Sequence, residues 1–234
     1  DINVNTDGAA DADVTFTANS TVDNAQSLTI DAGAGGNVSM GADVGATTPL
    51  TEFNIVEAND VTLAGVTTQG TAVANTINIG SAAAIGGTIT LTGDLSTAGA
   101  AGDTGNIRID NANQVILEAD GAGTAGSILM QTNGTTTTDG LVDFVGAAGF
   151  DVISATPYED GLSLDVGNNN ADLSGASLNQ LDHLVVSTAT AGGYSVTLPA
   201  VAVGDGAGLG ATPQDSIDIT AESLNLQGNL STDS

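Results

Sequence analysis

Apolar and polar residues alternate in short runs along this chain, and clusters of small polar residues separate the runs. Three stretches share one outline: residues 54–65 (NIVEANDVTLAG), 106–120 (NIRIDNANQVILEAD) and 216–228 (SIDITAESLNLQG). In each, a short alternating strand is followed by a few small polar residues and a second short strand. A period-two pattern that stops at tight corners and then resumes is typical of a chain that winds around a narrow core, one turn stacked on the last.

The same alternation predicts strands along the whole length. They are expected at residues 14–18, 27–32, 37–40, 52–57, 61–64, 76–79, 88–92, 106–110, 114–118, 127–131, 141–145, 150–154, 162–166, 183–187, 194–198, 216–220 and 223–227. Gly, Asn, Asp and Ala separate almost all of them, and these residues favour positive φ and tight bends. Helical spacing of leucines occurs only in residues 175–184 (GASLNQLDHL), which predict either a short helix or a loop over one end of a sheet.

These features predict an all-β fold with little or no helix, a parallel β-helix (β-solenoid) that spans residues 1–234 as a single continuous domain. With ~20 to 25 residues per turn, the chain would make about ten turns and rise about 50 Å. Insertions at residues 98–105 and 135–140 are expected to bulge at corners without disturbing the stack.

The composition agrees with a narrow core. Of 234 residues, 41% are apolar but only 3% are aromatic, so the core is made of Ala, Val, Ile and Leu, which suit a thin tube between sheets. Thirty-two glycines could indicate disorder instead. The recurring β-branched strands argue against that interpretation.

The strongly negative net charge limits the classes of partner that the chain can bind. There are 28 Asp and Glu residues against one Arg, no Lys and one His, a formal net charge of -27. Without a basic patch, the chain is not expected to bind nucleic acid or an anionic membrane surface. No apolar run approaches the ~20 residues of a membrane span. Carboxylates on neighbouring turns would repel by about 1 kcal/mol per pair in water, which cations or salt would relieve.

Cysteine is absent, which excludes disulfides and thiolate metal sites. This composition is compatible with the exterior of a bacterium or archaeon. We therefore expect an extracellular or cell-surface location.

A short repeat suggests how the ends behave. Residues 91–97 (LTGDLST) match residues 226–232 (LQGNLST), and the first copy continues into the strand at 106–110. If the second copy continued likewise, the next strand would resemble residues 1–6 (DINVNT). The chain then reads as a segment of a tandem array or as a subunit that stacks head to tail on neighbouring copies of itself. Unpaired strand edges at such ends favour end-to-end association.

Residues 24–68, with AQSLTIDAGAG, GADVGATTPLT and DVTLAGVTT, carry a family resemblance. This stretch resembles repeats of the very large filamentous-haemagglutinin-like adhesins of bacterial surfaces. The resemblance implies a right-handed parallel β-helix that is secreted and displayed in long fibres for attachment, with host or cell-surface glycans or proteins as partners. It implies no catalytic residue.

Catalytic groups do not converge in the sequence. Arg108 and His183 are far apart and lack a partner motif, so we expect no enzyme. His183 is predicted at the surface or at the end of a strand, and Arg108 outward on a strand, facing carboxylates such as Asp110 or Glu118. A β-helical polysaccharide-cleaving enzyme is the alternative from another class, since some such enzymes work with Asp carboxylates alone.

Two acidic clusters are candidate Ca²⁺ sites, because Ca²⁺ takes six to eight oxygen ligands from flexible loops. They comprise Asp7, Asp11 and Asp13 in one loop, and Asp165, Asn168, Asn170 and Asp172 in another. Asp and Asn also form turns without any metal. Diffuse cation binding by the acidic faces is a further alternative. No other cofactor is expected.

The sequence therefore predicts a structural or adhesive repeat segment of an extracellular prokaryotic fibre. A self-assembling filament or sheath subunit stabilised by cations is the alternative within the same class.

Overall fold

The structure is a computed structural model that describes residues 1–69, 75–98, 105–119, 125–134, 139–146, 149–189, 191–204 and 216–233. All regular structure in these residues is β-strand, and every strand pairing is parallel. The strands form three sheets, which we call A, B and C.

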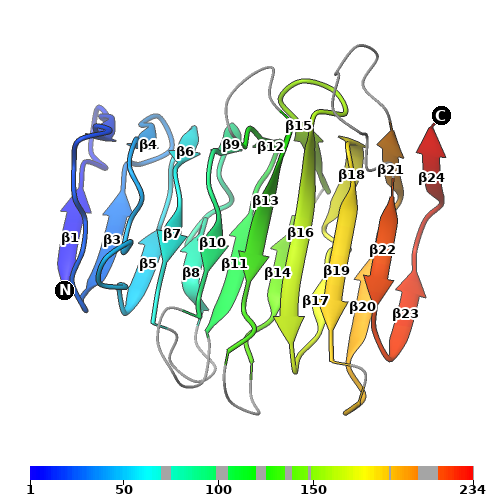
Figure 1. The fold of residues 1–234 in the computed structure, drawn as a ribbon. Helices are drawn as coiled ribbons and strands as arrows, with labels where there is room; N and C mark the ends of the chain where they lie inside the picture. The colour runs from blue at the N-terminus through cyan, green and yellow to red at the C-terminus, as the bar shows by residue number, and fades with distance from the viewer. Residues whose placement is uncertain are drawn as a thin grey trace.

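Sheets A and B run the length of the molecule, and sheet C covers the third side (Figure 1). Sheet A contains, in order, β1 (Ile2–Asn5), β3 (Ser27–Asp31), β5 (Glu52–Ile55), β8 (Asn75–Ile79), β11 (Asn106–Asp110), β14 (Val142–Val145), β17 (Ala171–Asp172), β20 (Ser195–Leu198) and β23 (Ser223–Leu226). Sheet B contains β2 (Val14–Phe16), β4 (Val38–Met40), β6 (Val61–Leu63), β9 (Thr88–Leu91), β12 (Gln114–Leu117), β15 (Phe150–Ser154), β18 (Ala176–Leu181), β21 (Val201–Gly204) and β24 (Leu230–Asp233). Sheet C contains β7 (Val66–Thr67), β10 (Leu95–Ser96), β13 (Gly126–Gln131), β16 (Asp160–Gly167), β19 (Leu184–Thr188) and β22 (Ile217–Thr220).

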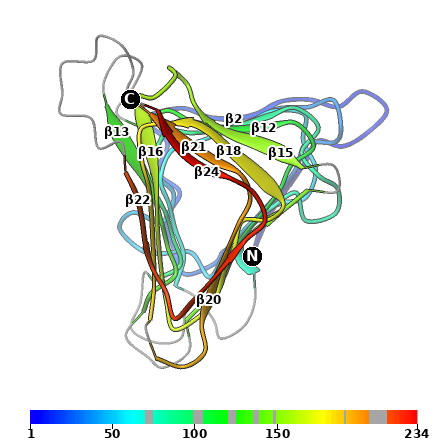
Figure 2. The same cartoon turned by 90° about the vertical axis from the view of Figure 1, so that its right-hand side faces the viewer.

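Each coil passes from sheet A to sheet B to sheet C and then enters the next coil. Viewed along the axis, the sheets enclose a triangular core (Figure 2), and the chain turns in the right-handed sense as it advances. Single bridges from Val22 to Val44 and from Val44 to Val66 extend sheet C into the first two coils. The predicted parallel β-helix is thus confirmed, with nine coils, the ninth made of β23 and β24.

The core consists of columns of aliphatic side chains, because the coils stack in register. One column of sheet A runs Ile2, Leu28, Phe53, Ile77, Ile107, Val142, Ala171, Val196 and Leu224. Its members from Leu28 to Val196 are almost fully buried. Alternate residues point outward, so the same strands build a polar outer face.

The coils are longer than predicted, which is why there are nine rather than about ten. Phe53 pairs with Ile77, 24 residues on, whereas Ile107 pairs with Val142, 35 residues on. Residues 99–104 and 135–138 of the two predicted insertions lie outside the described residues. Their flanks meet at the corner from sheet C to sheet A. There the buried Thr97 and Thr132 hydroxyls donate to the carbonyls of Gly105 and Gly140, both at 2.6 Å.

The helix considered for residues 175–184 is wrong, because this segment forms β18 and the start of β19. Leu178, Leu181 and Leu184 are all buried although they are three residues apart. The register of β18 against β21 shifts between Leu178 and Leu181, and Gln180 has φ 57°. This irregularity, followed by a corner, turns all three leucines inward and imitates helical spacing.

The repeat at residues 91–97 and 226–232 does not mark equivalent positions. The first copy lies at the corner from sheet B to sheet C, between β9 and β10, whereas the second lies between β23 of sheet A and β24 of sheet B. Residues 1–6 contain β1, which belongs to sheet A, whereas β24 belongs to sheet B. Each coil runs from A to B to C, so a strand equivalent to β1 could follow β24 only after a segment of sheet C. The predicted direct continuation is therefore wrong, since any strand-corner-strand unit fits more than one corner.

Candidate functional site

Asp and Asn side chains connect successive coils at the corners, where the strand ladders stop. Asp13 Oδ1 accepts a hydrogen bond from the Asn37 amide at 2.9 Å, and Asp60 Oδ1 accepts one from the Thr88 amide at 2.8 Å. Similar bonds to the next coil are accepted by Asp11, Asp23, Asn37, Asp43, Asp94, Asn106, Asp139 and Asn170. These side chains satisfy backbone amides that would otherwise lack a partner.

The first predicted calcium cluster takes part in this bonding. Asp11 accepts from the amides of Gly8, at 3.2 Å, and Gly35, at 2.8 Å, while Asp13 accepts from Asn37. Asp7 is exposed in the same loop. Asp11 and Asp13 thus each bind an amide of the second coil, which uses oxygens that Ca²⁺ would need.

The second predicted calcium cluster is spread around one corner. Asp165, on β16, accepts from Asn133 Nδ2 at 2.9 Å, and Asn168 donates to Asp139. The other two members bond elsewhere: Asn170 accepts from the Ser195 amide, and Asp172, on β17, accepts from the Ser174 amide. Among the described residues, no three His, Cys, Asp or Glu side chains form a group able to hold a metal ion. Calcium binding at either cluster stays a prediction.

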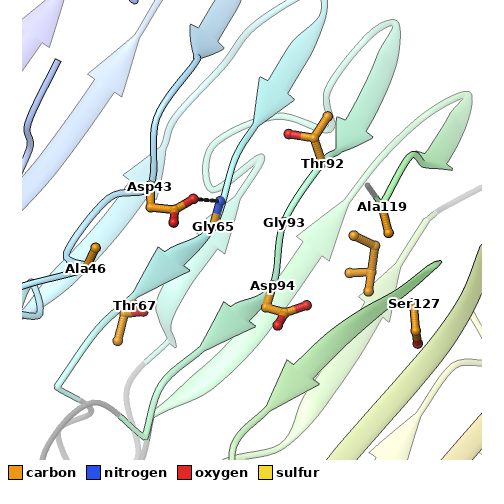
Figure 3. A pocket seen from close by; sticks show the side chains of 10 residues that line it. Asp43, Ala46, Gly65, Thr67, Thr92, Gly93, Asp94, Ala119 and Ser127 are labelled. Atoms are coloured by element: carbon orange, nitrogen blue, oxygen red, sulfur yellow. Dashed lines mark hydrogen bonds between the residues drawn. The ribbon is translucent and has the colours of Figure 1, made fainter. Parts of the chain in front are cut away.

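A groove of about 670 Å³ follows the corner between sheets B and C (Figure 3). It is lined by Asp43, Ala46, Gly65, Thr67, Thr92, Gly93, Asp94, Ala119, Ser127 and Ile128. Asp43 and Asp94 are fixed there by the amides of Gly65, at 2.9 Å, and Leu129, at 2.8 Å. The groove therefore presents positioned carboxylates and, at one end, the Ser127 hydroxyl.

Ser127, His183 and Asp182 form a hydrogen-bonded chain beside this groove. The His183 Nδ1 atom lies 2.7 Å from Asp182 Oδ2, and its Nε2 atom lies 3.2 Å from Ser127 Oγ. His183 and Asp182 are buried, at 6% and 9% exposure, whereas Ser127 is exposed. His183 directly precedes the first residue of β19, next to the predicted place at the end of a strand, but it is not a surface residue. Its ring is covered because it reaches back across sheet C.

The place of Gly161 explains this reach. In sheet C, Ser127 on β13 pairs with Gly161 on β16, and His183 immediately precedes Leu184, the first residue of β19, which pairs with Leu162. His183 thus lies two strands from Ser127, with Gly161 between them. A Cβ atom at Gly161 would overlap the His183 ring. The missing side chain leaves the imidazole room to reach the serine.

Buried acids lie behind this cluster. Asp160 and Glu159 are each 1% exposed, and both oxygens of Glu159 and Oδ1 of Asp160 have no hydrogen-bond partner among the described residues. The pKa of the Asp160 carboxyl is raised from 3.8 to about 7, chiefly by burial, with smaller contributions from the charges of Glu159 and Glu118. The hydrogen bond from Ser154 acts in the opposite direction.

The backbone is strained at the same place. Tyr158 and Gln180 have φ of 64° and 57°, and the Tyr158 amide donates to the Gln180 carbonyl at 2.8 Å. Left-handed backbone at non-glycine residues costs about 1–3 kcal/mol and is concentrated at functional sites. The strain thus falls beside the buried acids and the Asp182–His183 pair.

Arg108 faces outward from β11, as predicted, and its guanidinium binds Asp110 at 2.7 Å. In the outward column of sheet A it lies next to Asp143, which is followed by Asp172. Burial and then the Asp172 charge raise the pKa of Asp143, while Arg108 lowers it. Arg108 therefore relieves part of the repulsion in a row of stacked carboxylates.

Sequence reasoning missed the Ser127 site because Ser127 and the Asp182–His183 pair lie two coils apart, 56 residues from Ser127 to His183. The adjacent pair Asp182–His183 was the one signal available, and its partner serine could be found only from the register. Comparison of the chain with family models, with curated proteins and with solved structures gives no match. Within the described part of the chain, no helix has the length and hydrophobicity that crossing a membrane requires.

The corner bonds generate a stability prediction at Asp60. Asp60→Ala leaves the Thr88 amide without its acceptor and should lower the free energy of unfolding by about 1.5–3 kcal/mol. Asp60→Asn keeps an acceptor oxygen and should cost less than about 1 kcal/mol. Urea unfolding measures both, with exposed Asp218→Ala as the control. Equal losses for Asp60→Ala and Asp218→Ala would contradict the proposed role of the corner carboxylates.

The raised pKa of Asp160 generates a pH prediction. Unfolded chains release this proton near pH 3.8, whereas the folded chain holds it to about pH 7. The contribution of Asp160 to stability is therefore fully present below about pH 4, falls as the pH rises from about 4 to about 7, and is then constant. Asp160→Asn should remove this decline, so its advantage over wild type in unfolding free energy should grow across that range.

Asp218→Asn, which removes the same charge at an exposed position, is the matched control. Its effect reports only the general repulsion of the acidic chain. Urea titrations at pH 4, 5.5, 7 and 8 separate the two. Parallel curves for Asp160→Asn and Asp218→Asn would show that burial does not perturb Asp160.

Proposed function

We propose that the protein is a structural and adhesive segment of an extracellular prokaryotic fibre, whose ends are axial contact surfaces. The observation that carries this proposal is that the inward columns remain open at both ends. Ile2 is 52% exposed, and Leu224, Leu226 and Leu230 are 44%, 49% and 38% exposed. These four are the large hydrophobic residues that are exposed in the described chain.

The exposed residues lie in register with the core. Ile2 pairs with Leu28 at one end, and Leu224 pairs with Val196 at the other, within a single inward column. A further coil laid on either end would bury them and would pair the open edges of β1 and β23. Open parallel edges with apolar side chains favour such addition.

The acidic outer faces of the three sheets disfavour side-by-side association of two copies. With a net charge of -27 and a single Arg, the outer faces of two copies repel each other over roughly a Debye length, ~8 Å at physiological salt. Contact at the ends brings fewer carboxylates together for each apolar group that it buries. Axial growth is thus favoured over lateral packing, and this is the geometry of a fibre.

The outer faces provide the surface for attachment. The outward column of sheet A carries Asn3, Thr29, Asn54, Asn78, Arg108, Asp143, Asp172, Thr197 and Asn225. Such a flat row of hydroxyl, amide and carboxylate groups suits hydrogen bonding to glycans or to protein surfaces. The resemblance of residues 24–68 to filamentous-haemagglutinin-like repeats supports the same role.

The open ends generate an assembly prediction. Sedimentation velocity and negative-stain electron microscopy should show reversible, concentration-dependent end-to-end association of the purified chain into thin rods, strengthened by salt. Leu224→Asp combined with Leu226→Asp places charge in the inward columns at one end and should abolish association. Ala82→Asp together with Ala112→Asp adds the same charge at exposed positions on the side of the molecule and should leave association intact.

Two results would contradict the proposal. One is a chain that stays monomeric at every concentration although its ends are bare. The other is association into lateral rafts that the Leu224 and Leu226 substitutions do not affect.

A further inference from the structure

We propose that Ser127, His183 and Asp182 form a nucleophilic site that hydrolyses small uncharged or cationic esters bound in the groove between sheets B and C. This activity goes beyond a structural role in a fibre. It rests on the order of the three groups, on the access to each of them, and on the charge of the groove.

The hydrogen bonds fix the order of the groups. An ionised Asp182 carboxylate can only accept, so His183 Nδ1 carries the proton of their 2.7 Å contact. The neutral ring then has its lone pair on Nε2, which lies 3.2 Å from Ser127 Oγ and can accept the hydroxyl proton. Ser127 Oγ also lies 3.0 Å from the Ser163 hydroxyl, which can donate to it and so leaves the Ser127 proton for His183. Carboxylate, imidazole and hydroxyl in this sequence form the arrangement that activates a serine for attack on a carbonyl.

A serine nucleophile must be open to substrate, whereas its histidine and carboxylate partners work best when shielded from water, and the three groups differ in exposure in this way. Ser127 is exposed and lines the groove, so a substrate can reach Oγ. Asp182 and His183 are shielded from water, which strengthens their interaction. Asp182 is also placed by its backbone, since its amide donates to the Asp160 carbonyl at 3.0 Å.

A donor for the developing oxyanion lies beside the nucleophile. The Leu129 amide points toward the preceding coil, where it donates to Asp94 Oδ1. Amide directions alternate along a strand, so the Ser127 amide, two residues earlier, points to the same side, where the groove lies. A backbone N–H in this position can stabilise negative charge on a carbonyl oxygen.

The reaction balances with the ester and water alone. Ser127 Oγ attacks the carbonyl carbon while its proton passes to His183 Nε2, and the C–O bond to the alcohol then breaks as His183 returns that proton to the leaving oxygen. Water attacks the acyl-serine, gives one proton to His183 and releases the carboxylic acid, and Ser127 recovers its proton. Asp182 stays ionised throughout and holds the ring in place.

The groove selects the substrate class by charge. Asp43 and Asp94 line it, and none of its lining residues is basic. An anionic acyl or alcohol group would be repelled, whereas an uncharged ester, such as an acylated sugar hydroxyl, or a cationic ester would be accepted.

The test uses a fluorophosphonate probe, which reacts with activated serines, followed by intact-mass measurement and peptide mapping. The folded wild-type chain should gain one adduct, on Ser127, and Ser127→Ala should gain none. His183→Gln should slow the labelling by about a hundredfold or more, and Asp182→Asn by about tenfold or more. The same variants should slow the release of p-nitrophenol from p-nitrophenyl acetate in the same order.

Controls separate this chemistry from folding and from general reactivity. Circular dichroism and thermal melting verify that each variant is folded, and Ser187→Ala, which removes a hydroxyl elsewhere on sheet C, should label like wild type. Gly161→Ala, which displaces the His183 ring, should slow labelling at Ser127. The absence of an adduct on the folded wild type, or labelling of Ser127 at an unchanged rate in His183→Gln, would overturn the proposal.

Discussion

Each coil of this solenoid is held by backbone hydrogen bonds to its neighbouring coils, and despite a local shift between β8 and β11 one inward column continues from Ile2 on β1 to Leu224 on β23. Because the coils stack in register, side chains at each inward position form a column. The space between neighbouring columns limits the size and shape of the residues that can be buried there. The enclosed space is narrow, so stacked Val, Ile and Leu fill it and few aromatic residues are needed; Phe53 and Phe144 are the largest fully buried side chains in the described structure.

The same constraint gives a physical reason for the acidity of the chain. At corners the ladder of backbone bonds is interrupted, and amides of the next coil need acceptors. A carboxylate such as Asp60 or Asp94 supplies one directly, whereas a Lys side chain has only donors. The cost is repulsion between stacked carboxylates, as in the Asp143–Asp172 pair. Arg108 relieves that repulsion at one place only.

Stacking also determines how a site can form on such a surface. Each coil contributes one side chain to a given outward position, so groups that meet come from successive coils. Ser127, Gly161 and His183 occupy neighbouring places on three strands of sheet C, and the reach of the imidazole depends on the glycine between. The strained backbone at Tyr158 and Gln180 lies beside this cluster. The left-handed conformations lower local stability while they hold the neighbouring side chains in place.

Most of the longer strands could be predicted from the sequence, but two-residue strands such as β7 and β10, the irregular β18, and the sheet that each strand joins could not. The bounds of β11 and β15 agree with the alternation to the residue, because a period of two is a local property. Residues 216–228 look like residues 54–65, yet they span sheets C and A rather than A and B. The same small polar residues form all three corners, so the sequence of a corner does not show which two sheets it joins. The site was missed for the same reason: contact between Ser127 and His183 depends on the lengths of the intervening coils.

Cross-linking of paired cysteines tests the register most directly, because the chain has no Cys of its own. Asn54 and Asn78 are partners on adjacent strands, about 4.8 Å apart at Cα, which is within reach of a disulfide. Asn54 and Arg108 are separated by one further strand, about 9.6 Å, which is too far. The account predicts that Asn54→Cys with Asn78→Cys oxidises to an intramolecular disulfide and that Asn54→Cys with Arg108→Cys does not. Efficient bridging of the second pair, or none in the first, would contradict the stacked register on which the whole structure is built.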